Sequence, residues 1–236
     1  MPCAGSGSRA GGDLPKQYQL LHGLPMVCHT LRALAQTAGI AQVCVVIASD
    51  DAHMANVQQQ HAHLWPAMSL QTPAIGGDSR AASVLAGLLH LRAKGVPDGD
   101  WVLVHDAARC LVTPEQITDL IHACQNDAVG GLLAVPLADT LKSAHHDRAD
   151  QTLSRENKWL AQTPQMFRLG MLINALERAQ ATNFEGITDE ASAMERMGHS
   201  VRLVPSSTHN FKVTYPQDWI LAEALLQLRQ THQGKA

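Results

Sequence analysis

The sequence predicts an α/β fold in which helices cover both faces of a mostly parallel sheet. Short apolar runs alternate along the chain with segments of helical period, which is typical of that architecture. A length of 236 residues suits one large domain with a single core. Hydrophobic residues make up 45% of the chain, which excludes a disordered protein. We therefore expect residues 1–236 to form one domain.

The predicted strands are apolar and rich in β-branched residues. Residues 42–48 form a nearly continuous apolar run, as expected of a strand buried on both faces. Residues 101–104 form a second such strand, which leads directly into His105 and Asp106. Further strands are expected at 129–135, at 201–204 and around 211–213.

The predicted helices show apolar residues at helical spacing and recognisable start signals. Thr113, Pro114 and Gln116 have the spacing of a capping box with proline in the first turn. Thr188 is the expected N-cap of a helix over 189–197. Other helices are expected at 24–37, 51–60, 83–94, 169–180 and 217–229.

Residues 136–158 break this pattern, because they are too polar to belong to a core. Residues 140–142 and 152–155 read as two short strands, joined by the polar stretch 143–151. The segment is therefore predicted to be an extended hairpin that projects from the domain as an arm.

Composition limits the partners and the cellular compartment. A formal net charge of −3 provides no basic footprint for nucleic acid. No apolar run approaches the roughly 18 residues of a membrane helix, and the first residues lack the pattern of a signal peptide. The 5 cysteines are scattered, which favours free thiols over disulfides or a zinc site. We expect a cytoplasmic protein that binds neither nucleic acid nor a membrane.

A glycine-rich segment at residues 2–9 predicts a phosphate-binding loop. Closely spaced glycines let backbone N–H groups approach a phosphate chain, and Arg9 and Lys16 supply positive charge. Gly5, Gly7 and Ala10 also fit a dinucleotide fingerprint, but no acidic residue follows at the required distance. A flexible tail is the remaining alternative.

A second turn, Gly76-Gly77-Asp78, leads into the helix expected at 83–94. Its exposed backbone groups, with Arg80 and Ser83 facing the same space, suit hydrogen bonding to the edge of a base. The alternative is an ordinary helix-entry turn with Ser83 as its cap.

Asp106 lies at the carboxyl end of a predicted strand, where open α/β sheets bind their ligands. We interpret Asp106 as a contact for magnesium or ribose. His105 points to the opposite face of the strand and is interpreted as structural. The alternative for Asp106 is an ion pair with Arg109 that ends the strand.

Several polar residues further along the chain could bind a phosphate group. The helix N-terminus at Thr188 would attract anions, and Arg155 and Lys212 could clamp a phosphate. Taken singly, each of these residues also fits a solvated surface position. The set comprises Thr140, Lys142, Arg155, Thr163, Thr188, Asp189, Glu190 and Lys212.

Together these segments resemble the 2-C-methyl-D-erythritol 4-phosphate cytidylyltransferase family. The resemblance spans nearly the whole chain, and the joint order and spacing of the motifs are highly specific. The motifs are Pro2–Arg9, Pro15–Tyr18, Gly76–Asp78 with Arg80 and Ser83, Val104–Arg109, Ala138–Lys142, Gln162–Gln165, Thr188–Ala191 and Lys212–Thr214.

The resemblance implies a Rossmann-like nucleotidyltransferase sheet with a projecting β-arm, and a homodimer in which each arm completes the neighbouring site. The implied reaction joins CTP to methylerythritol phosphate, with release of pyrophosphate, in non-mevalonate isoprenoid biosynthesis. It implies Mg²⁺ or another divalent cation, held by Asp106 directly or through water. Such chemistry needs positioning and positive charge rather than a nucleophilic side chain.

The resemblance also implies a role for each matching residue. Arg9 and Lys16 would stabilise charge on the α-phosphorus, and Arg155 and Lys212 complete the expected catalytic set. The nucleotide would be bound by Pro2, Ala4, Gly5, Gly7, Gly77, Asp78, Ser83, Asp106 and Ala107. The sugar-alcohol phosphate would be bound by Asp106, Arg109, Thr140, Arg155, Thr163, Thr188 and Lys212, with Thr140 and Arg155 supplied by the partner's arm.

The chain departs from the family pattern at two places. Cys110 stands where many relatives carry proline, a small change in a turn. The family also has an apolar strand before the glycine loop, whereas only Met1 precedes Pro2 here. We expect the natural protein to begin earlier, with roughly 6–10 further residues that include an apolar, β-branched run.

Two rival functions share parts of this pattern. A cytidylyltransferase for ribitol phosphate would share the nucleotide half, but the arm residues and the segment 188–190 argue against it. A non-catalytic nucleotide-binding protein would follow if the short N-terminus disabled the site. Arg9 and Lys16 argue against that reading, because a pure binder needs no charge stabilisation at the α-phosphorus.

Overall fold

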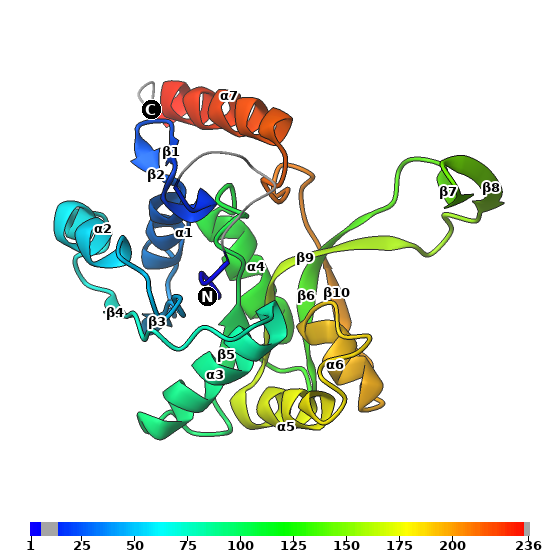
Figure 1. Ribbon diagram of the computed structural model, residues 1–236, viewed down its shortest axis with the longest axis horizontal. Coiled ribbons are helices and arrows are strands. Elements are labelled where there is room, and N and C mark those ends of the chain that lie inside the picture. Colours follow the sequence, from blue (N-terminus) through cyan, green and yellow to red (C-terminus); the bar gives the residue numbers. More distant parts are fainter. Residues whose placement is uncertain (6–13, 234–236) are drawn as a thin grey trace.

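A mixed four-stranded sheet forms the centre of the molecule in the computed structural model, which describes residues 1–5 and 14–233 (Figure 1). Its strand order is β10-β6-β9-β5. β6 and β10 are parallel, whereas β9 runs antiparallel to both of its neighbours. The strands are β5 (Trp101–Val104), β6 (Gly130–Pro136), β9 (Trp159–Arg168) and β10 (Arg202–Pro205).

β9 corrects the prediction of a mostly parallel sheet, because no strand was predicted at 159–168 and β9 runs antiparallel to both of its neighbours. Gln162, Thr163 and Gln165 are buried polar residues of this strand, and Pro164 interrupts its pattern. Polar residues and proline weaken the period-2 signal by which strands are recognised. The α/β class itself is confirmed.

A separate two-stranded parallel sheet pairs β3 (Gln42–Cys44) with β4 (Ser69–Gln71). Only residues 42–44 of the predicted strand 42–48 pair with β4, although Val43 to Ile47 are all buried as expected. Beyond Cys44 the chain stays extended, and Val46 forms an isolated parallel bridge with Pro2.

Helices cover both faces of the central sheet. α3 (Arg80–Ala93), α5 (Leu169–Gln180) and α6 (Glu190–Arg196) pack in one core cluster with residues such as Val102 and Phe167. α4 (Pro114–Cys124) packs against Leu133 and Met166 in another cluster. α1 (Met26–Ala35) and α2 (Met54–His61) pack with β3, and α7 (Pro216–Gln233) packs near the start of the chain.

Most helix predictions hold, with corrections at the caps. The capping box of Thr113 and Gln116 is present at α4. Ser79 rather than Ser83 caps α3, which begins at Arg80. Asp189 rather than Thr188 caps α6, because the Asp189 carboxylate accepts the N–H of Ser192. The smaller elements, none of them predicted, are β1 (Leu20–Leu21), β2 (Leu24–Pro25), and the 3₁₀ turns η2 (Lys16–Tyr18) and η3 (Ala62–Leu64).

The arm is a hairpin of β7 (Leu141–His145) and β8 (Arg148–Leu153) that projects from the body (Figure 1). The prediction that residues 143–151 form a connector is wrong, because most of these residues belong to β7 and β8. The turn itself is formed by His146 and Asp147, both at positive φ, which suits the tight turn of a two-residue hairpin loop. The strands are polar because both faces of the hairpin are exposed, which removes the alternation expected of a strand.

Residues 211–213 do not form the predicted strand. Val213 instead donates a single backbone hydrogen bond to the Ala108 carbonyl at 2.9 Å, which holds the segment beside the end of β5. All five cysteines are buried and unpaired, as predicted. Among the described helices, none has the length and apolar character needed to cross a membrane.

Candidate functional site

Asp106 lies between two cations just beyond the carboxyl end of β5. Its Oδ1 accepts a hydrogen bond from Arg80 Nε at 2.8 Å, and its Oδ2 accepts one from Lys212 Nζ at 2.9 Å. Arg80 is the first residue of α3, and Lys212 lies in the extended segment before α7. The carboxylate therefore pairs with residues far away in sequence, and the alternative of an ion pair with Arg109 is wrong.

The two cations keep Asp106 ionised despite its burial. Burial alone would raise the pKa of the carboxyl, but the charges of Arg80 and Lys212 hold that pKa well below its usual range. The side chain of Lys212 is 42% exposed, whereas that of Asp106 is 10% exposed. A ligand approaching from solvent therefore meets the lysine with the carboxylate behind it.

A hydrogen-bond chain fixes the backbone of Asp106. The Asp106 N–H donates to Thr163 Oγ1 at 3.0 Å, and that hydroxyl lies 3.0 Å from His105 Nδ1. His105 Nε2 lies 3.2 Å from the Arg109 carbonyl, which can only accept, so Nε2 carries the proton. Nδ1 is then an acceptor, and the Thr163 hydroxyl donates to it.

Burial keeps this histidine neutral by lowering its pKa to about 4. His105 thus has the structural role predicted for it. Thr163, expected to contact substrate, is buried and uses its hydroxyl to position Asp106.

The Gly76-Gly77 turn packs directly against the start of the chain. A Cβ at Gly76 would lie 2.3 Å from the Cβ of Ala4 and 2.9 Å from the Ile47 carbonyl oxygen, so only glycine allows this approach. The Gly77 N–H donates to Ser83 Oγ at 3.1 Å, while Asp78 is exposed. Ala4, which belongs to the first glycine motif, therefore packs directly against the second.

Lys16 extends this surface towards Lys212. Its Nζ donates to the Val213 carbonyl at 2.7 Å, one residue beyond Lys212. Gln17 ties the same segment to the first loop, because its Nε2 donates to the Cys3 and Gly5 carbonyls at 2.9 and 3.1 Å. Pro2, Ala4 and Gly5 belong to the described residues, whereas the predicted contacts Gly7 and Arg9 lie outside them.

Arg109 carries a positive charge that backbone groups hold in place. Its Nη1 donates to the Asn210 carbonyl at 2.8 Å, and its Nη2 donates to the Ala161 carbonyl at 3.2 Å. Burial lowers the pKa of Arg109, and Asp106 opposes that effect. Carbonyl oxygens orient a guanidinium without neutralising it, so Arg109 suits recognition of an anion.

At the N-terminus of α6, where an anion was predicted to bind near Thr188, side chains already accept two of the first N–H groups. Asp189 accepts the N–H of Ser192 at 2.9 Å, and Gln165 Oε1 accepts the N–H of Ala191 at 2.8 Å. These two side chains occupy N–H groups of the first turn that an anion would need. Thr188 itself is exposed beside this cap.

Thr140 and Arg155 lie on the arm, apart from the residues around Asp106. Both side chains are exposed, and Arg155 Nη1 donates to the Ala138 carbonyl at the base of the arm. Within one chain the structure therefore brings together Lys16, Asp106, Arg109 and Lys212 but not the two arm residues. Ala107 is buried, and its carbonyl accepts a hydrogen bond from Thr30 at 3.2 Å.

Arg80 and Glu190 were each placed in a motif by the sequence analysis, but their pairing with one another was not predicted. Arg80 Nη1 and Nη2 donate to both oxygens of Glu190, at 2.7 and 3.0 Å, while its Nε holds Asp106. Glu190 is 1% exposed, so this carboxylate is buried and depends on Arg80 as its partner. Arg80 stood within a recognised motif, but nothing in its local spacing indicated partners 26 and 110 residues away.

Asp106 is the carboxylate that could hold a divalent metal ion. In residues 1–5 and 14–233, no three His, Cys, Asp or Glu side chains come together as a metal cluster. Asp106 is a single hard oxygen donor beside a cationic surface. That donor set matches Mg²⁺, which keeps several waters and is held by one or two carboxylates together with substrate phosphates.

The arrangement can orient a phosphate chain and stabilise negative charge that develops on it. Lys16, Arg109 and Lys212 supply positive charge around one carboxylate, beside the Gly76-Gly77 turn, whose N–H groups donate to the Ile47 carbonyl and to Ser83 Oγ. Phosphoryl-type transfer needs these features above others.

Comparison with known proteins gives consistent matches over the chain. The family model described as IspD, 2-C-methyl-D-erythritol 4-phosphate cytidylyltransferase, matches residues 1–228. A protein from Cupriavidus pinatubonensis with that name is 49% identical over 234 residues, covering 96% of this chain and 92% of its own length. The bifunctional enzyme IspD/IspF of Albidiferax ferrireducens is 57% identical over 231 residues, and the chain spans about half (53%) of that longer relative.

Solved structures show the same fold. A 4-diphosphocytidyl-2C-methyl-D-erythritol synthase superposes with a TM-score of 0.81 at 36% identity, covering 89% of this chain and 94% of the other. The Thermus thermophilus 2-C-methyl-D-erythritol 4-phosphate cytidylyltransferase superposes with a TM-score of 0.74 at 29% identity, covering 93% and 96%. These neighbours have a Rossmann-like nucleotidyltransferase fold.

Proposed function

The chain belongs to the 2-C-methyl-D-erythritol 4-phosphate cytidylyltransferase family, and from this premise we propose that it transfers the cytidylyl group of CTP to that sugar-alcohol phosphate. A phosphate oxygen of the acceptor attacks the α-phosphorus, and the bond from the α-phosphorus to the bridging oxygen breaks. The products are 4-diphosphocytidyl-2-C-methyl-D-erythritol and pyrophosphate. The reaction serves non-mevalonate isoprenoid biosynthesis.

The observation that carries the proposal is the cationic surface around Asp106 at the end of β5. Lys16 and Lys212 are held next to each other by the segment 212–213, and both can face the phosphates of CTP. Lys16 would stabilise charge that develops as the α-phosphorus is attacked, and Arg9 would share that role. Arg109, whose charge is not neutralised by its carbonyl partners, suits the acceptor phosphate.

The glycine turns support binding of the nucleotide. Gly5 and Asp78 are exposed, and the Gly76-Gly77 turn packs against Ala4, so we place the nucleotide along this surface and expect Gly7 as a further contact. Ser83 holds the turn through bonds to the Gly77 N–H and carbonyl, so its contribution to reading cytosine is to position Gly77.

Mg²⁺ would be held by Asp106, directly or through water, together with the phosphates of CTP. When bound, it supplies positive charge that neutralises the triphosphate. Arg80 and Lys212 keep the carboxylate of Asp106 ionised for that purpose. Thr163 and His105 keep its backbone in place.

We also propose a homodimer in which the arm of one subunit completes the site of the other. Thr140 and Arg155 are exposed on the arm, and Trp159 and Leu160 at its base are 37% and 52% exposed. Large apolar side chains at the base of a projecting hairpin are typical of an interaction surface. The five unpaired cysteines support a reducing compartment, the cytoplasm.

A substrate panel tests the proposed specificity. Purified protein is incubated with CTP and either methylerythritol phosphate or ribitol phosphate, and with UTP in place of CTP, and the nucleotide product is identified by mass spectrometry. We expect kcat/KM to be at least about 100-fold higher for CTP with methylerythritol phosphate than for either substitution. Equal or higher kcat/KM with ribitol phosphate would overturn the assignment.

A further inference from the structure

Asn210 is a fully buried amide in the segment between β10 and α7. The residue is 0% exposed, and it lies two positions before Lys212. The N–H groups of a buried amide require acceptors, because an unmade hydrogen bond is costly away from water. The acceptors of the Asn210 side chain lie on β9, whereas its backbone contacts Arg109. One residue therefore connects β9 with both cations that follow β5 and β10.

Two backbone carbonyls decide which way this amide points. Asn210 Nδ2 donates to the Thr163 carbonyl at 2.9 Å and to Gln162 Oε1 at 3.1 Å. Gln162 Nε2 donates in turn to the Ser207 carbonyl at 3.0 Å. A backbone carbonyl can only accept, so each of the two amides has a single orientation in which it donates. The segment 207–210 is thus fastened to β9 at two points.

The backbone of Asn210 also holds the guanidinium of Arg109. The Asn210 carbonyl accepts from Arg109 Nη1 at 2.8 Å, and the Ala161 carbonyl accepts from Nη2 at 3.2 Å. Ala161 lies on β9 directly before Gln162, to which the Asn210 side chain is bound. If the segment 207–210 moved away from β9, these two carbonyls would separate and the guanidinium would lose one of its supports.

The residues after Asn210 carry the second cation. Lys212 Nζ donates to Asp106 Oδ2 at 2.9 Å, and the Val213 N–H donates to the Ala108 carbonyl at 2.9 Å. Residues 211–213 belong to no strand, so no ladder of backbone bonds holds them. The position of Lys212 therefore depends on Asn210 on one side and on Val213 on the other.

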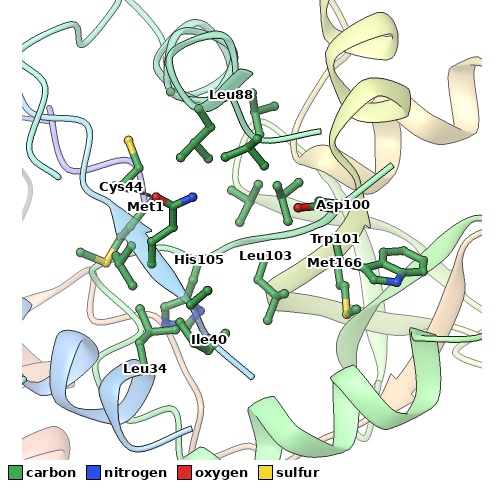
Figure 2. Close-up of a pocket in the computed structure, with 18 of the residues that line it drawn as sticks. Met1, Leu34, Ile40, Cys44, Leu88, Asp100, Trp101, Leu103, His105 and Met166 are labelled. Carbon is green, nitrogen blue, oxygen red and sulfur yellow. Dashed lines mark hydrogen bonds between the residues drawn. The ribbon is translucent and has the colours of Figure 1, made fainter. Parts of the chain in front are cut away.

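The strand that receives Asn210 is itself bound to the backbone of Asp106. Thr163 Oγ1 accepts the Asp106 N–H at 3.0 Å and lies 3.0 Å from His105 Nδ1. His105 is buried, and together with Ile40 it lines an apolar pocket beside β5, away from the solvent (Figure 2). Thr163 is therefore the common point that holds Asp106 through its hydroxyl and Asn210 through its carbonyl.

We propose that Asn210 is a positioning residue for the acceptor phosphate, because it fixes the spacing between Arg109 and Lys212 by fastening the segment 207–213 to β9. This inference rests on the proposed function, which assigns Arg109 to that phosphate. Two cations bind one phosphate well only when both lie within hydrogen-bond reach of it at once. Asn210 touches no substrate in this role, and its effect falls on the acceptor more than on CTP.

A purely structural role is the alternative, and it predicts a different result. Loss of a buried amide lowers the free energy of unfolding in either case. Only a positioning role changes the KM for the acceptor while CTP binding stays nearly the same. Only this role makes the effect of Asn210 depend on the presence of Arg109.

The test compares Asn210→Ala with the unmodified chain in steady-state kinetics at saturating CTP. We expect the KM for methylerythritol phosphate to rise at least about tenfold, while the Kd for CTP changes less than about threefold. The matched control is Thr37→Ala, just after α1, which also removes a buried side-chain donor to a backbone carbonyl, that of Ala33 at 2.8 Å. Its KM should stay within about twofold of the unmodified value.

A double-mutant cycle shows whether Asn210 acts through the guanidinium. In a chain that already carries Arg109→Ala, the substitution Asn210→Ala should raise KM by about threefold or less, since the group that Asn210 orients is gone. An equal rise in KM with and without Arg109 would overturn the positioning role.

Amide hydrogen exchange at Val213 provides a measurement that needs no turnover. We expect this amide to exchange at least about tenfold faster in Asn210→Ala than in Thr37→Ala, because the segment loses its attachment to β9. Failure of the unmodified chain to form any product would refute the proposed function, and faster exchange at Val213 would still support the attachment of the segment by Asn210. Unchanged exchange together with an unchanged KM in an active enzyme would overturn the inference alone.

If Asn210→Ala does not refold, Gln162→Ala replaces it in the same experiments. This substitution removes one acceptor of the Asn210 amide and the bond to the Ser207 carbonyl. A higher KM for the acceptor with faster exchange at Val213 then supports the proposal, and unchanged values of both overturn it.

Discussion

Lys16 binds the backbone next to Lys212, so the two lysines lie close together at the segment 212–213. Lys16 donates to the Val213 carbonyl, and Lys212 pairs with Asp106. Both ammonium groups are thus held at the segment 212–213 and the carboxylate beside it. We expect their contributions to differ, with Lys16 acting mainly on charge that develops during transfer.

Replacement of Lys16 tests this assignment. Lys16→Ala should lower kcat by roughly 100- to 1,000-fold, the usual effect of removing one donor aimed at developing charge, while the Kd for CTP changes much less. The same is expected of Arg9→Ala. Steady-state kinetics and calorimetric titration with CTP measure the two quantities. Lys94→Ala, at an exposed position after α3, is the matched control. Retention of more than about a tenth of the activity in Lys16→Ala would exclude the role.

His105 predicts how stability depends on pH. Its pKa is about 4 in the folded protein and 6.5 in a free side chain, so the unfolded chain binds the proton more tightly between those values. The free energy of unfolding should therefore fall as the pH drops from 6.5 towards 4. The expected loss from this residue is about 2 kcal/mol between pH 7 and pH 5.

The comparison that isolates this effect uses His105→Gln, which does not titrate. Urea unfolding at both pH values should show a smaller pH dependence in the variant than in the unmodified chain, by about that amount. If the free energies of unfolding of the two proteins depend on pH in the same way, the His105 side chain is not a buried neutral imidazole.

At the scale of elements, Arg80 connects three parts of the fold. As the first residue of α3 it binds Asp106 after β5 and both oxygens of Glu190 on α6. Two of these elements carry predicted site residues. The position of Asp106 therefore depends on the packing of α3 and α6 against the sheet.

Breaking this connection should cost stability as well as activity. Arg80→Ala leaves Glu190 buried without a partner, for which about 3 kcal/mol is expected. The control is Arg92→Ala on the same helix, whose partner Glu177 lies at 3.8 Å with both side chains nearly half exposed. An exposed pair of this kind contributes below about 1 kcal/mol. Equal losses in urea unfolding for the two variants would contradict the central role of Arg80.

The elements also show what the sequence could predict. The start of α4 was predicted from Thr113 and Gln116, because a capping box can be recognised in the local sequence. Asp106 was found because strand ends position ligands in α/β sheets. β9 was missed because Pro164 and buried polar residues obscure it, and its hydrogen bonds come from strands distant in sequence. The bonds of Arg80 to Asp106 and Glu190 were missed for the same reason: only the folded chain brings these residues together.

At the scale of the whole molecule, the residues of the proposed site lie on two separate parts of the chain, the body and the arm. Arg155 follows β8 at the base of the arm, while Lys16 belongs to η2 of the body. In a homodimer built as proposed, each site would take Lys16 from one subunit and Arg155 from the other.

Mixed dimers test this arrangement. Arg155→Ala and Lys16→Ala should each be weakly active alone. When the two variants are unfolded, mixed and refolded, one site in each mixed dimer escapes both changes, so activity should return in part. The presence of mixed dimers is verified with a tag on one variant. Mixed dimers with no recovered activity would place Arg155 in its own subunit's site or outside any site.

Pyrophosphate release shows whether the surface around Asp106 transfers the cytidylyl group of CTP to methylerythritol phosphate. The release is measured with CTP, methylerythritol phosphate and Mg²⁺, and each substrate is omitted in turn. We expect steady release only when both substrates are present, with one pyrophosphate formed for each 4-diphosphocytidyl-2-C-methyl-D-erythritol. Release from CTP alone at the same rate, or no release with both substrates, would refute the transfer.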